Sequence, residues 1–359
     1  MTDQNQQAAE TAQVEVIKAD ARDLPLPDSS VDLIVTSPPY YRQRAYDGLP
    51  LDGQIGQEAT PDAFVTSLIE VTEECLRVLR PAGSLWVNLG EKYLDRSLSG
   101  IPWRYALRCM DDLCLALRAE VVWSKPNGFI DAKARDRVRR THETWLHFAR
   151  PGKYDADVDA IRVIPEADYR DRPQYRRAEE LFTQAGLTEA HRAAVRAVGV
   201  IDSDGGGVRS GGRWTSENGR LAAEVRDALG SYYREFCGSR GERGVVPGSV
   251  KTVAAHPFKI PASLGLKGHF ASFPIEWPLW IIRGWSQPGA TVLDPFGGTG
   301  TTALAAHVLG RRGITVDDSS ESCRIAEWRT ADRGQIERAR AVSEKSTPPG
   351  HPTSPEAAS

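Results

Sequence analysis

The sequence predicts an α/β fold built around an open, largely parallel sheet. Three observations favour this class: short apolar runs alternate with segments of helical periodicity, a glycine-rich loop joins one such run to a helix, and the alternation is present near both ends of the chain but not in its middle. Of the 359 residues, 40% are hydrophobic and 26% are charged, which is typical of a globular protein. This length allows one large domain with an insertion, or two domains.

The first two strands are expected at residues 14–17 and 31–36, because both runs are short, apolar and rich in β-branched side chains, as in buried parallel strands. The linker between them is too short for a helix that crosses to a parallel neighbour. We therefore expect that these two strands do not pair directly with each other in the sheet. The second strand ends abruptly at Ser37, Pro38, Pro39 and Tyr40.

The next elements continue the alternation. A helix is predicted to begin at Thr60 and Pro61, a capping residue followed by a first-turn proline, and to stop at residues 81–83. After it, the apolar pattern predicts a strand at 84–89, a helix at 105–117, and strands at 119–123 and 138–147.

The alternation is lost from residue 151 to about residue 248, where charged helical segments, arginines and glycine runs predominate. We interpret this part as an inserted or appended domain. The pattern returns with a helix at 275–285, a strand at 291–293, a glycine loop at 296–300, a helix at 302–309 and a strand at 313–316. The predicted organisation is thus a disordered N-terminus (1–13), one domain in two halves (14–150 and 251–335), a separate region (151–250) and a solvated tail (336–359).

Charge and cysteine content exclude several classes of protein. The 45 basic and 48 acidic side chains give a formal net charge of -3, so any surface for nucleic acid must be local. The five cysteines lack CxxC spacing, which argues against a structural zinc site and a secreted disulfide framework, and no metal site is expected. Without a signal peptide or a membrane-spanning segment, the expected location is cytoplasmic.

The glycine loop, residues 294–302, has the features of a nucleoside site. Its glycines let a ligand approach the backbone, and the following helix offers free amide donors. It has neither the lysine of a Walker loop nor the GxGxxG order of a dinucleotide site. Asp317 ends the next strand, where a carboxylate can bind a ribose diol. With Asp294 as a second acid, the pattern favours a cationic cofactor, S-adenosylmethionine, although a tight turn alone would also use these glycines.

The Ser37-Pro38-Pro39-Tyr40 corner follows a strand directly, where open α/β sheets place their ligands. Its two prolines leave a rigid edge of carbonyl acceptors that can hold an NH2 group. The Tyr40 ring can stack on a nucleobase taken out of the duplex. Alone, the corner would more simply be a stiff surface turn, but the glycine loop favours the functional interpretation.

Together these segments resemble the amino-methylating DNA methyltransferases, which act on exocyclic nitrogens of cytosine or adenine. Residues 36–40 are similar to the catalytic tetrapeptide of that family, 294–302 to its cofactor loop, and 269–274 to the segment that contacts the methionine end of the cofactor. The order of these motifs resembles the permuted class called beta. Glu91 departs from the pattern, since it stands where an aspartate is expected. Further matching segments are 18–21, 85–90, 123–127 and 139–143.

The resemblance implies a Rossmann-like S-adenosylmethionine-dependent methyltransferase sheet with circularly permuted motif order. It implies a catalytic half at 14–150, a target-recognition region at 151–250 and a cofactor-binding half at 251–335. The catalytic residues implied are Ser37, Pro38, Pro39 and Tyr40. The cofactor-binding residues implied are Asp20, Ala21, Phe273, Pro274, Asp294, Pro295, Phe296, Gly298, Gly300, Thr301 and Asp317.

The expected reaction is direct methyl transfer to the amino group of a flipped base, held by the Ser37 hydroxyl and the Pro38 carbonyl. A carbon-5 methyltransferase would need a Pro-Cys nucleophile, and no cysteine follows a proline. By resemblance, serine at the first catalytic position favours cytosine N4. Adenine N6 is the alternative, RNA or a protein amide is a less favoured acceptor, and a DNA-binding protein with a vestigial cofactor site is the third interpretation.

A basic run is the predicted surface for DNA phosphates. Asp131 and Asp136 interleave with it, so a solvated, salt-bridged face is the simpler alternative. The expected partners are double-stranded DNA and a cognate restriction endonuclease, while the oligomeric state is left open. The run consists of Lys133, Arg135, Arg137, Arg139 and Arg140.

Overall fold

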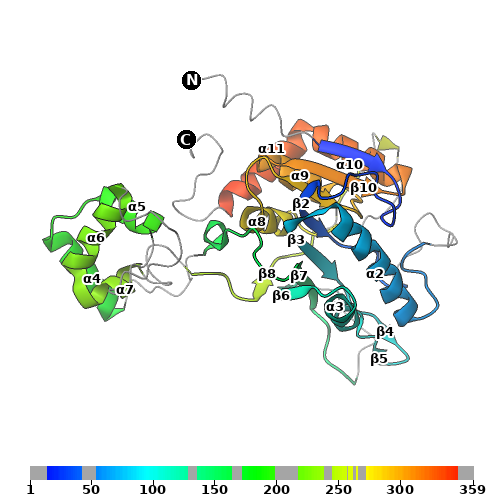
Figure 1. Cartoon of the computed structure of the whole chain (residues 1–359), viewed down its shortest axis with the longest axis horizontal. Coiled ribbons are helices and arrows are strands. Elements are labelled where there is room, and N and C mark those ends of the chain that lie inside the picture. Colours follow the sequence, from blue (N-terminus) through cyan, green and yellow to red (C-terminus); the bar gives the residue numbers. More distant parts are fainter. Residues whose placement is uncertain are drawn as a thin grey trace. The chain divides into compact units, whose positions relative to one another are not determined.

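The computed structural model groups the chain into two compact units (Figure 1). The first comprises Met1–Asp157 and Gly248–Ser346, and the second comprises Val158–Pro247, in each case over the residues that the structure describes. No helix within that described part is long and apolar enough to cross a membrane. The described residues are 14–42, 54–127, 136–163, 172–198, 217–237, 245–256, 258–261, 264–265 and 272–346.

The first unit contains an eight-stranded sheet in the order β1-β10-β9-β2-β3-β7-β6-β8. Strand β7 pairs antiparallel with β3 and β6, and all the other pairings in this sheet are parallel. The predicted α/β fold with strands from both ends of the chain is confirmed. The strands are β1 (Val14–Lys18), β2 (Val31–Thr36), β3 (Leu79–Leu89), β6 (Ala116–Ser124), β7 (His142–Ala149), β8 (Val250–Thr252), β9 (Thr291–Asp294) and β10 (Arg312–Asp317), with a separate hairpin of β4 (Tyr93–Leu94) and β5 (Ser97–Leu98).

Strands β1 and β2 do not pair with each other, because β10 and β9 lie between them, as the short linker predicted. The prediction that both are buried is correct for β2, in which Leu33, Ile34 and Val35 are fully buried. It is wrong for β1, which is only half-buried because it forms the edge of the sheet and pairs with β10 alone.

Helices cover both faces of this sheet. The N-terminus of α2 (Pro61–Val78) is capped by the Thr60 hydroxyl, which accepts a hydrogen bond of 3.1 Å from the Ala63 amide. Leu85 and Val87 of β3 pack in the same core as α2 and α3 (Ile101–Asp111). Trp86, which points to the opposite face, contacts two tryptophans of α8 (Glu276–Trp285). The remaining helices are α9 (Thr301–Val308), α10 (Ser320–Ala331) and α11 (Arg333–Lys345).

Helix α3 begins and ends earlier than the predicted 105–117. It starts after Gly100, whose φ of 72° is left-handed, and has Pro102 in its first turn. The carboxylate of Glu91 caps it, accepting from the amides of Gly100 at 3.1 Å and Ile101 at 3.4 Å. The last residues of the predicted helix belong instead to β6. Because β6 continues the apolar pattern of the helix, the pattern does not show where the helix ends.

Three further boundaries differ from prediction. Helix α2 ends at Val78, before the predicted stop at 81–83, because β3 already begins at Leu79 and not at residue 84. The strand predicted at 138–147 begins and ends later, as β7 (His142–Ala149). Its position is set by pairing with β3, in which Thr144 lies opposite Leu89 and Ala149 opposite Ser84.

Helix α11 occupies the first part of the predicted tail, 336–359. It is held there by Arg283 of α8, which donates to the Ser343 hydroxyl at 2.6 Å. The rest of that tail, and the N-terminal residues 1–13, lie outside the described residues.

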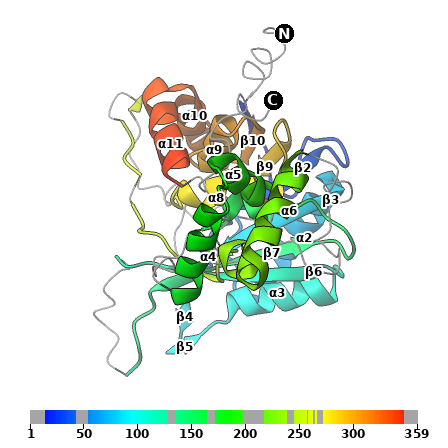
Figure 2. The same ribbon diagram turned by 90° about the vertical axis from the view of Figure 1, so that its left-hand side faces the viewer.

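The second unit is a small cluster of helices, drawn in green in Figure 2. Its core stacks the rings of Phe182 and Phe236 at 5.0 Å. Arg192 lies over the Phe182 ring at 4.3 Å and forms an ion pair with Glu179. The elements are η2 (Val158–Ile161), α4 (Pro173–Gln184), α5 (Glu189–Val198), α6 (Glu217–Leu229), η5 (Gly230–Tyr232) and α7 (Tyr233–Cys237).

Candidate active site

The two predicted motifs meet where the sheet changes its winding direction. Strands β2 and β9 are parallel neighbours, with Leu33 opposite Val292 and Ile34 opposite Leu293. From β2 the chain passes through α2 to β3 on one side, and from β9 through α9 to β10 on the other. In open α/β sheets such a switch point opens a crevice at the carboxyl ends of the strands. The Ser-Pro-Pro-Tyr corner and the glycine loop both begin there.

Asp294 joins these two segments. Its carboxyl accepts hydrogen bonds from the hydroxyl of Thr36 at 2.6 Å and of Thr302 at 2.8 Å, and from the Phe296 amide at 3.1 Å. The side chain is buried, and burial raises its pKa to about 6 despite these donors. One buried carboxyl therefore links the end of β2, the glycine loop and the start of α9.

The glycine loop has room over its backbone for a ligand. A Cβ at Gly297 would lie 1.5 Å from the Thr315 hydroxyl, so only glycine fits against β10. Gly298 and Gly300 have left-handed φ values of 49° and 72°. At Gly298 a Cβ would meet only a carbonyl oxygen 3.9 Å away, which leaves open space over the loop at this residue. These features fit a loop that cradles a nucleoside.

Asp317 is fixed beside this loop. Its two carboxylate oxygens accept from the amides of Gly298 at 2.8 Å and Ser319 at 3.0 Å, and burial raises its pKa. The Ser322 side chain adds a further hydrogen bond to this carboxyl, whose two oxygens have about four lone-pair sites in all. The carboxylate is therefore held at the end of β10 in a position to bind a diol at the loop.

Arg329 of α10 supports the loop and was not found from the sequence. Its Nη1 donates to the hydroxyls of Thr299 at 2.7 Å and Thr301 at 2.8 Å. Burial lowers its pKa to about 10. The Thr301 hydroxyl thus faces Arg329, and no motif in the sequence marked this arginine.

The other predicted cofactor residues lie on neighbouring segments. The Ala19 amide donates to the Asp317 carbonyl at 3.2 Å, which brings Asp20 and Ala21 to the end of β10. Asp20 forms an ion pair with Arg22 at 2.7 Å, and the hydrogen bond from this arginine lowers the pKa of Asp20.

Phe273 and Pro274 precede α8. The edge of the Phe273 ring packs against Trp145 of β7 at 5.4 Å, and Pro274 is buried. Residues 269–271 of the same predicted segment lie outside the described residues.

The Tyr40 side chain is fixed at both its ring and its hydroxyl. The hydroxyl lies 2.6 Å from Asn88 Oδ1 and 2.8 Å from Glu143 Oε2. The ring lies so close to residue 90 that a Cβ on Gly90 would come within 2.3 Å of it. Asn88 is fully buried and also accepts from the Ser37 hydroxyl, at 3.4 Å. Serine and tyrosine of the corner therefore share one amide acceptor.

A lysine completes this network. Lys125 forms an ion pair with Glu143, and its ammonium group lies 4.0 Å from the centre of the Trp123 ring. Asn88, Lys125 and Glu143 were not predicted as site residues. Their segments, 85–90, 123–127 and 139–143, were marked only by the resemblance, which is the one signal of these residues in the sequence.

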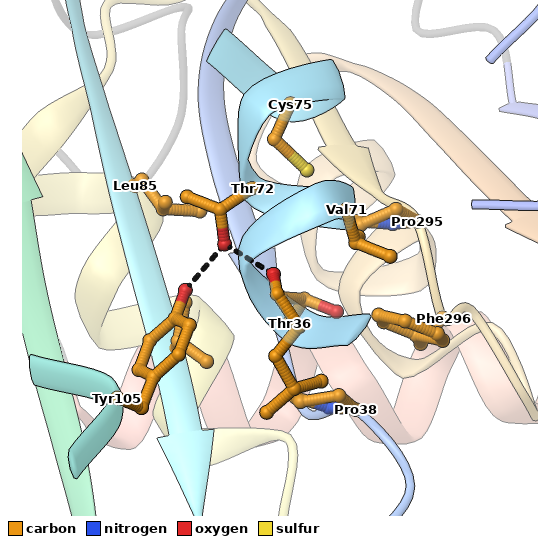
Figure 3. A pocket seen from close by; sticks show the side chains of 11 residues that line it. Thr36, Pro38, Val71, Thr72, Cys75, Leu85, Tyr105, Pro295 and Phe296 are labelled. Atoms are coloured by element: carbon orange, nitrogen blue, oxygen red, sulfur yellow. Dashed lines mark hydrogen bonds between the residues drawn. The ribbon is translucent and has the colours of Figure 1, made fainter. Parts of the chain in front are cut away.

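A small, largely apolar cavity lies between the corner, the glycine loop and α2 (Figure 3). The hydroxyls of Thr72 and Tyr105 hydrogen-bond to each other at its wall, 2.8 Å apart. It holds roughly one water molecule, far less than a nucleoside needs. Thr36, Pro38, Pro295 and Phe296 also line it.

Comparison with known proteins decides the family. Residues 31–328 match the family model of the N6 and N4 methyltransferases, described as DNA methylase. The chain belongs to this DNA methylase family. The expected methyltransferase fold and family are thereby confirmed.

Individual relatives of this DNA methylase are distant. It is 27% identical to the type II methyltransferase M.XycI of Xanthomonas campestris pv. cyanopsidis, over 86% of this chain and 83% of the relative. It is 27% identical to the type II methyltransferase M.SfiI of Streptomyces fimbriatus, over 81% and 84%. The solved structure of the cytosine-N4-specific PvuII DNA methyltransferase has a similar fold, with a TM-score of 0.57 and 17% identity over 94% of this chain and 93% of that one.

The predicted basic run of the methylase is only partly described, since Lys133 and Arg135 lie outside the described residues. Arg137 stacks on the Tyr93 ring at 3.6 Å, and Arg139 is exposed. Arg140 is half-buried, and burial lowers its pKa, an effect that Glu91, Glu143, Tyr93 and Tyr40 offset in part. Arg140 is thus within electrostatic range of Tyr40, and its Nε donates to the His142 carbonyl at 3.1 Å.

Proposed function

We propose that this DNA methylase transfers a methyl group from S-adenosylmethionine to the exocyclic N4 of cytosine in duplex DNA. Membership of the family establishes a methyltransferase that acts on DNA, and the choice of cytosine is our proposal. The observation that carries it is a neutral hydroxyl, Ser37, at the first position of a rigid corner beside the glycine loop. The family also includes N6 methylases, so adenine is the second candidate.

Bound S-adenosylmethionine would supply an electrophilic methyl group on a sulfonium centre. We propose that Asp317 binds its ribose diol, that Gly298 and Gly300 let it approach the backbone, and that Asp294 adds negative charge beside the loop. Because the pKa of Asp294 is about 6, this carboxyl is mostly ionised at neutral pH. The other residues proposed to contact the cofactor are Asp20, Ala21, Phe273, Pro274, Pro295, Phe296 and Thr301.

The corner must make a weak nucleophile react, because the lone pair of an exocyclic amino nitrogen is delocalised into the base. A carbonyl acceptor at Pro38 would draw on the amino hydrogens and return electron density to the nitrogen. Unlike a carboxylate, the Ser37 hydroxyl can also donate a hydrogen bond, for instance to N3 of cytosine. The Tyr40 ring, fixed by Asn88 and Glu143, would stack on the flipped base.

The protein must also hold the DNA around that base. We propose that Arg139 and Arg140 contact phosphates, since neither forms an ion pair within the described part of the chain. We propose that the region 151–250 recognises the target sequence. Because M.XycI and M.SfiI are named type II methyltransferases, a restriction endonuclease of the same specificity is the proposed partner.

Two measurements test this proposal. Labelled methyl groups should pass to duplex DNA and not to RNA or protein, and transfer to either of the latter would contradict it. In calorimetry, Asp317→Ala should weaken S-adenosylmethionine binding, whereas Asp318→Ala, the exposed neighbour, should not. If folded Asp317→Ala binds the cofactor as well as the parent protein does, the assignment of the diol site is wrong.

A further inference from the structure

Helix α3 carries an exposed apolar stripe. Trp103, Leu107 and Met110 are 60%, 57% and 41% exposed, and their spacing places them on one face of the helix. The buried residues Tyr105 and Cys109 point to the core that α3 shares with α2. Helix α3 lies at the lower edge of the first unit in Figure 2. Helix α3 therefore has two apolar faces, although only one of them packs in the core of the unit.

Two exposed charges flank this stripe. Arg104 and Asp111 lie about two turns apart and so share one side of the helix. The cation is in the first turn and the anion in the last, the reverse of what the helix dipole favours. Asp111 forms no ion pair within the described residues, whereas its neighbour Asp112 pairs with Arg108. Arg104 Nε donates to the Ser99 carbonyl at 3.0 Å, so its Nη groups remain for a partner, and Asp111 has no cation to pair with in its own helix.

A second copy of α3 would satisfy both charges. In an antiparallel pair of identical helices related by a twofold axis, residues on one flank face the same flank of the partner. Centred near Leu107, this pairing brings Arg104 of each copy to Asp111 of the other, whereas a parallel twofold pairing would place the two charged flanks on opposite sides of the interface, where these charges do not meet. We propose that α3 is a self-association surface, through which two copies of this chain pack antiparallel and bury Trp103, Leu107 and Met110.

The size of the surface sets the expected affinity. Helix α3 has 11 residues, a length of about 16 Å, and Leu98 of the β4–β5 hairpin, 37% exposed, is a further exposed apolar side chain close to it in sequence. A stable interface usually buries about 800 Å² on each partner, more than one short helix face supplies. The dimer should therefore form at micromolar concentration and dissociate on dilution. Mixed charges also make this face a poor surface for DNA phosphates.

Sedimentation of the full chain over a range of concentrations tests the proposal. The parent protein should dimerise, and Leu107→Glu should weaken association by about tenfold or more, because it places charge in the apolar contact. Val250→Glu is the matched control: Val250 is 64% exposed on β8, away from the stripe, and its substitution should leave association unchanged. A parent protein that stays monomeric, or a dimer that Leu107→Glu leaves intact, would overturn the proposal.

Charge exchange tests the orientation with exposed residues whose substitution leaves the core untouched. Arg104→Glu and Asp111→Lys should each weaken the dimer, because each opposes like charges across the twofold axis. The variant with both changes should recover most of the parental affinity. If the double variant is as weak as the sum of the single changes, the two residues do not face each other and the antiparallel assignment is wrong.

Discussion

The hydroxyl of Tyr40 lies 2.8 Å from a carboxylate oxygen of Glu143, a residue of the only strand in the main sheet that runs against its neighbours within the described residues. The same hydroxyl is 2.6 Å from Asn88 Oδ1. The phenol has one proton, which it can donate to either acceptor, and because Asn88 is on β3 and Glu143 on β7 these two strands together set the position of the hydroxyl. The corner is thus stiffened by its prolines and positioned by distant strands.

Tyr40 should act mainly through its ring. Tyr40→Ala should slow methyl transfer by the loss of a stacked base, worth ~1–3 kcal/mol, while cofactor affinity is unchanged. Tyr40→Phe should be less affected, because the ring still packs against Gly90. Single-turnover rates and calorimetry separate the two effects. If Tyr40→Ala methylates DNA at the parental rate, the corner is only a structural turn.

Glu143 should act through Tyr40. Glu143→Ala removes one acceptor of the tyrosine hydroxyl, which keeps Asn88, and leaves Lys125 without its ion pair, so kcat should fall, on the order of a hundredfold for a misplacement of about 1 Å. Glu143→Gln keeps an acceptor for Tyr40 and should retain more activity. Affinity for S-adenosylmethionine should stay at the parental value in both variants. A loss of cofactor binding equal to the loss of rate would contradict this positioning role.

Asp294 should give stability an unusual dependence on pH. Its folded-state pKa of about 6 exceeds the unfolded value of about 4, so the folded protein holds a proton that the unfolded chain has lost between these values. The contribution of Asp294 to stability should therefore decrease as pH rises across this window, by on the order of 2 to 3 kcal/mol.

Asp294→Asn isolates this effect, since an amide can keep hydrogen bonds to Thr36 and Thr302 without titrating. Urea unfolding of both proteins across this pH range gives the difference. A difference in unfolding free energy that does not change with pH would show that Asp294 titrates normally.

Gly297 should tolerate no side chain. Gly297→Ala places a methyl group into Thr315, so the glycine loop must move away from β10, lowering both stability and cofactor affinity. Gly248→Ala is the control, because a Cβ there meets nothing within 4 Å. Thermal unfolding and cofactor titration of the two variants should differ clearly, and equal behaviour would contradict the close approach at residue 297.

The corner and the glycine loop could be predicted because proline and glycine restrict or free the backbone at their own positions. The partners of Tyr40 could not be predicted, because they depend on the register in which the strands pair. Glu143 opposes Trp123, and Asn88 opposes Trp145, only once β3, β6 and β7 have paired. A strand pattern tells which residues alternate, not which residues they face.

The predictions of strand burial and of helix boundaries were wrong for similar reasons. The composition of β1 is that of a buried strand, but its place at the sheet edge is a property of the whole topology. The end of α3 was misplaced because the apolar residues that begin β6 extend the helical periodicity. Arg329, far from any motif, reaches the loop only through the packing of α10.

The product base tests the central claim most directly. Unmodified duplex DNA should be methylated by the pure protein with S-adenosylmethionine, digested to nucleosides and analysed by mass spectrometry. The corner with Ser37 predicts N4-methylcytosine, and Asp317→Ala should form much less of it. N6-methyladenine without N4-methylcytosine would contradict the assignment of the base.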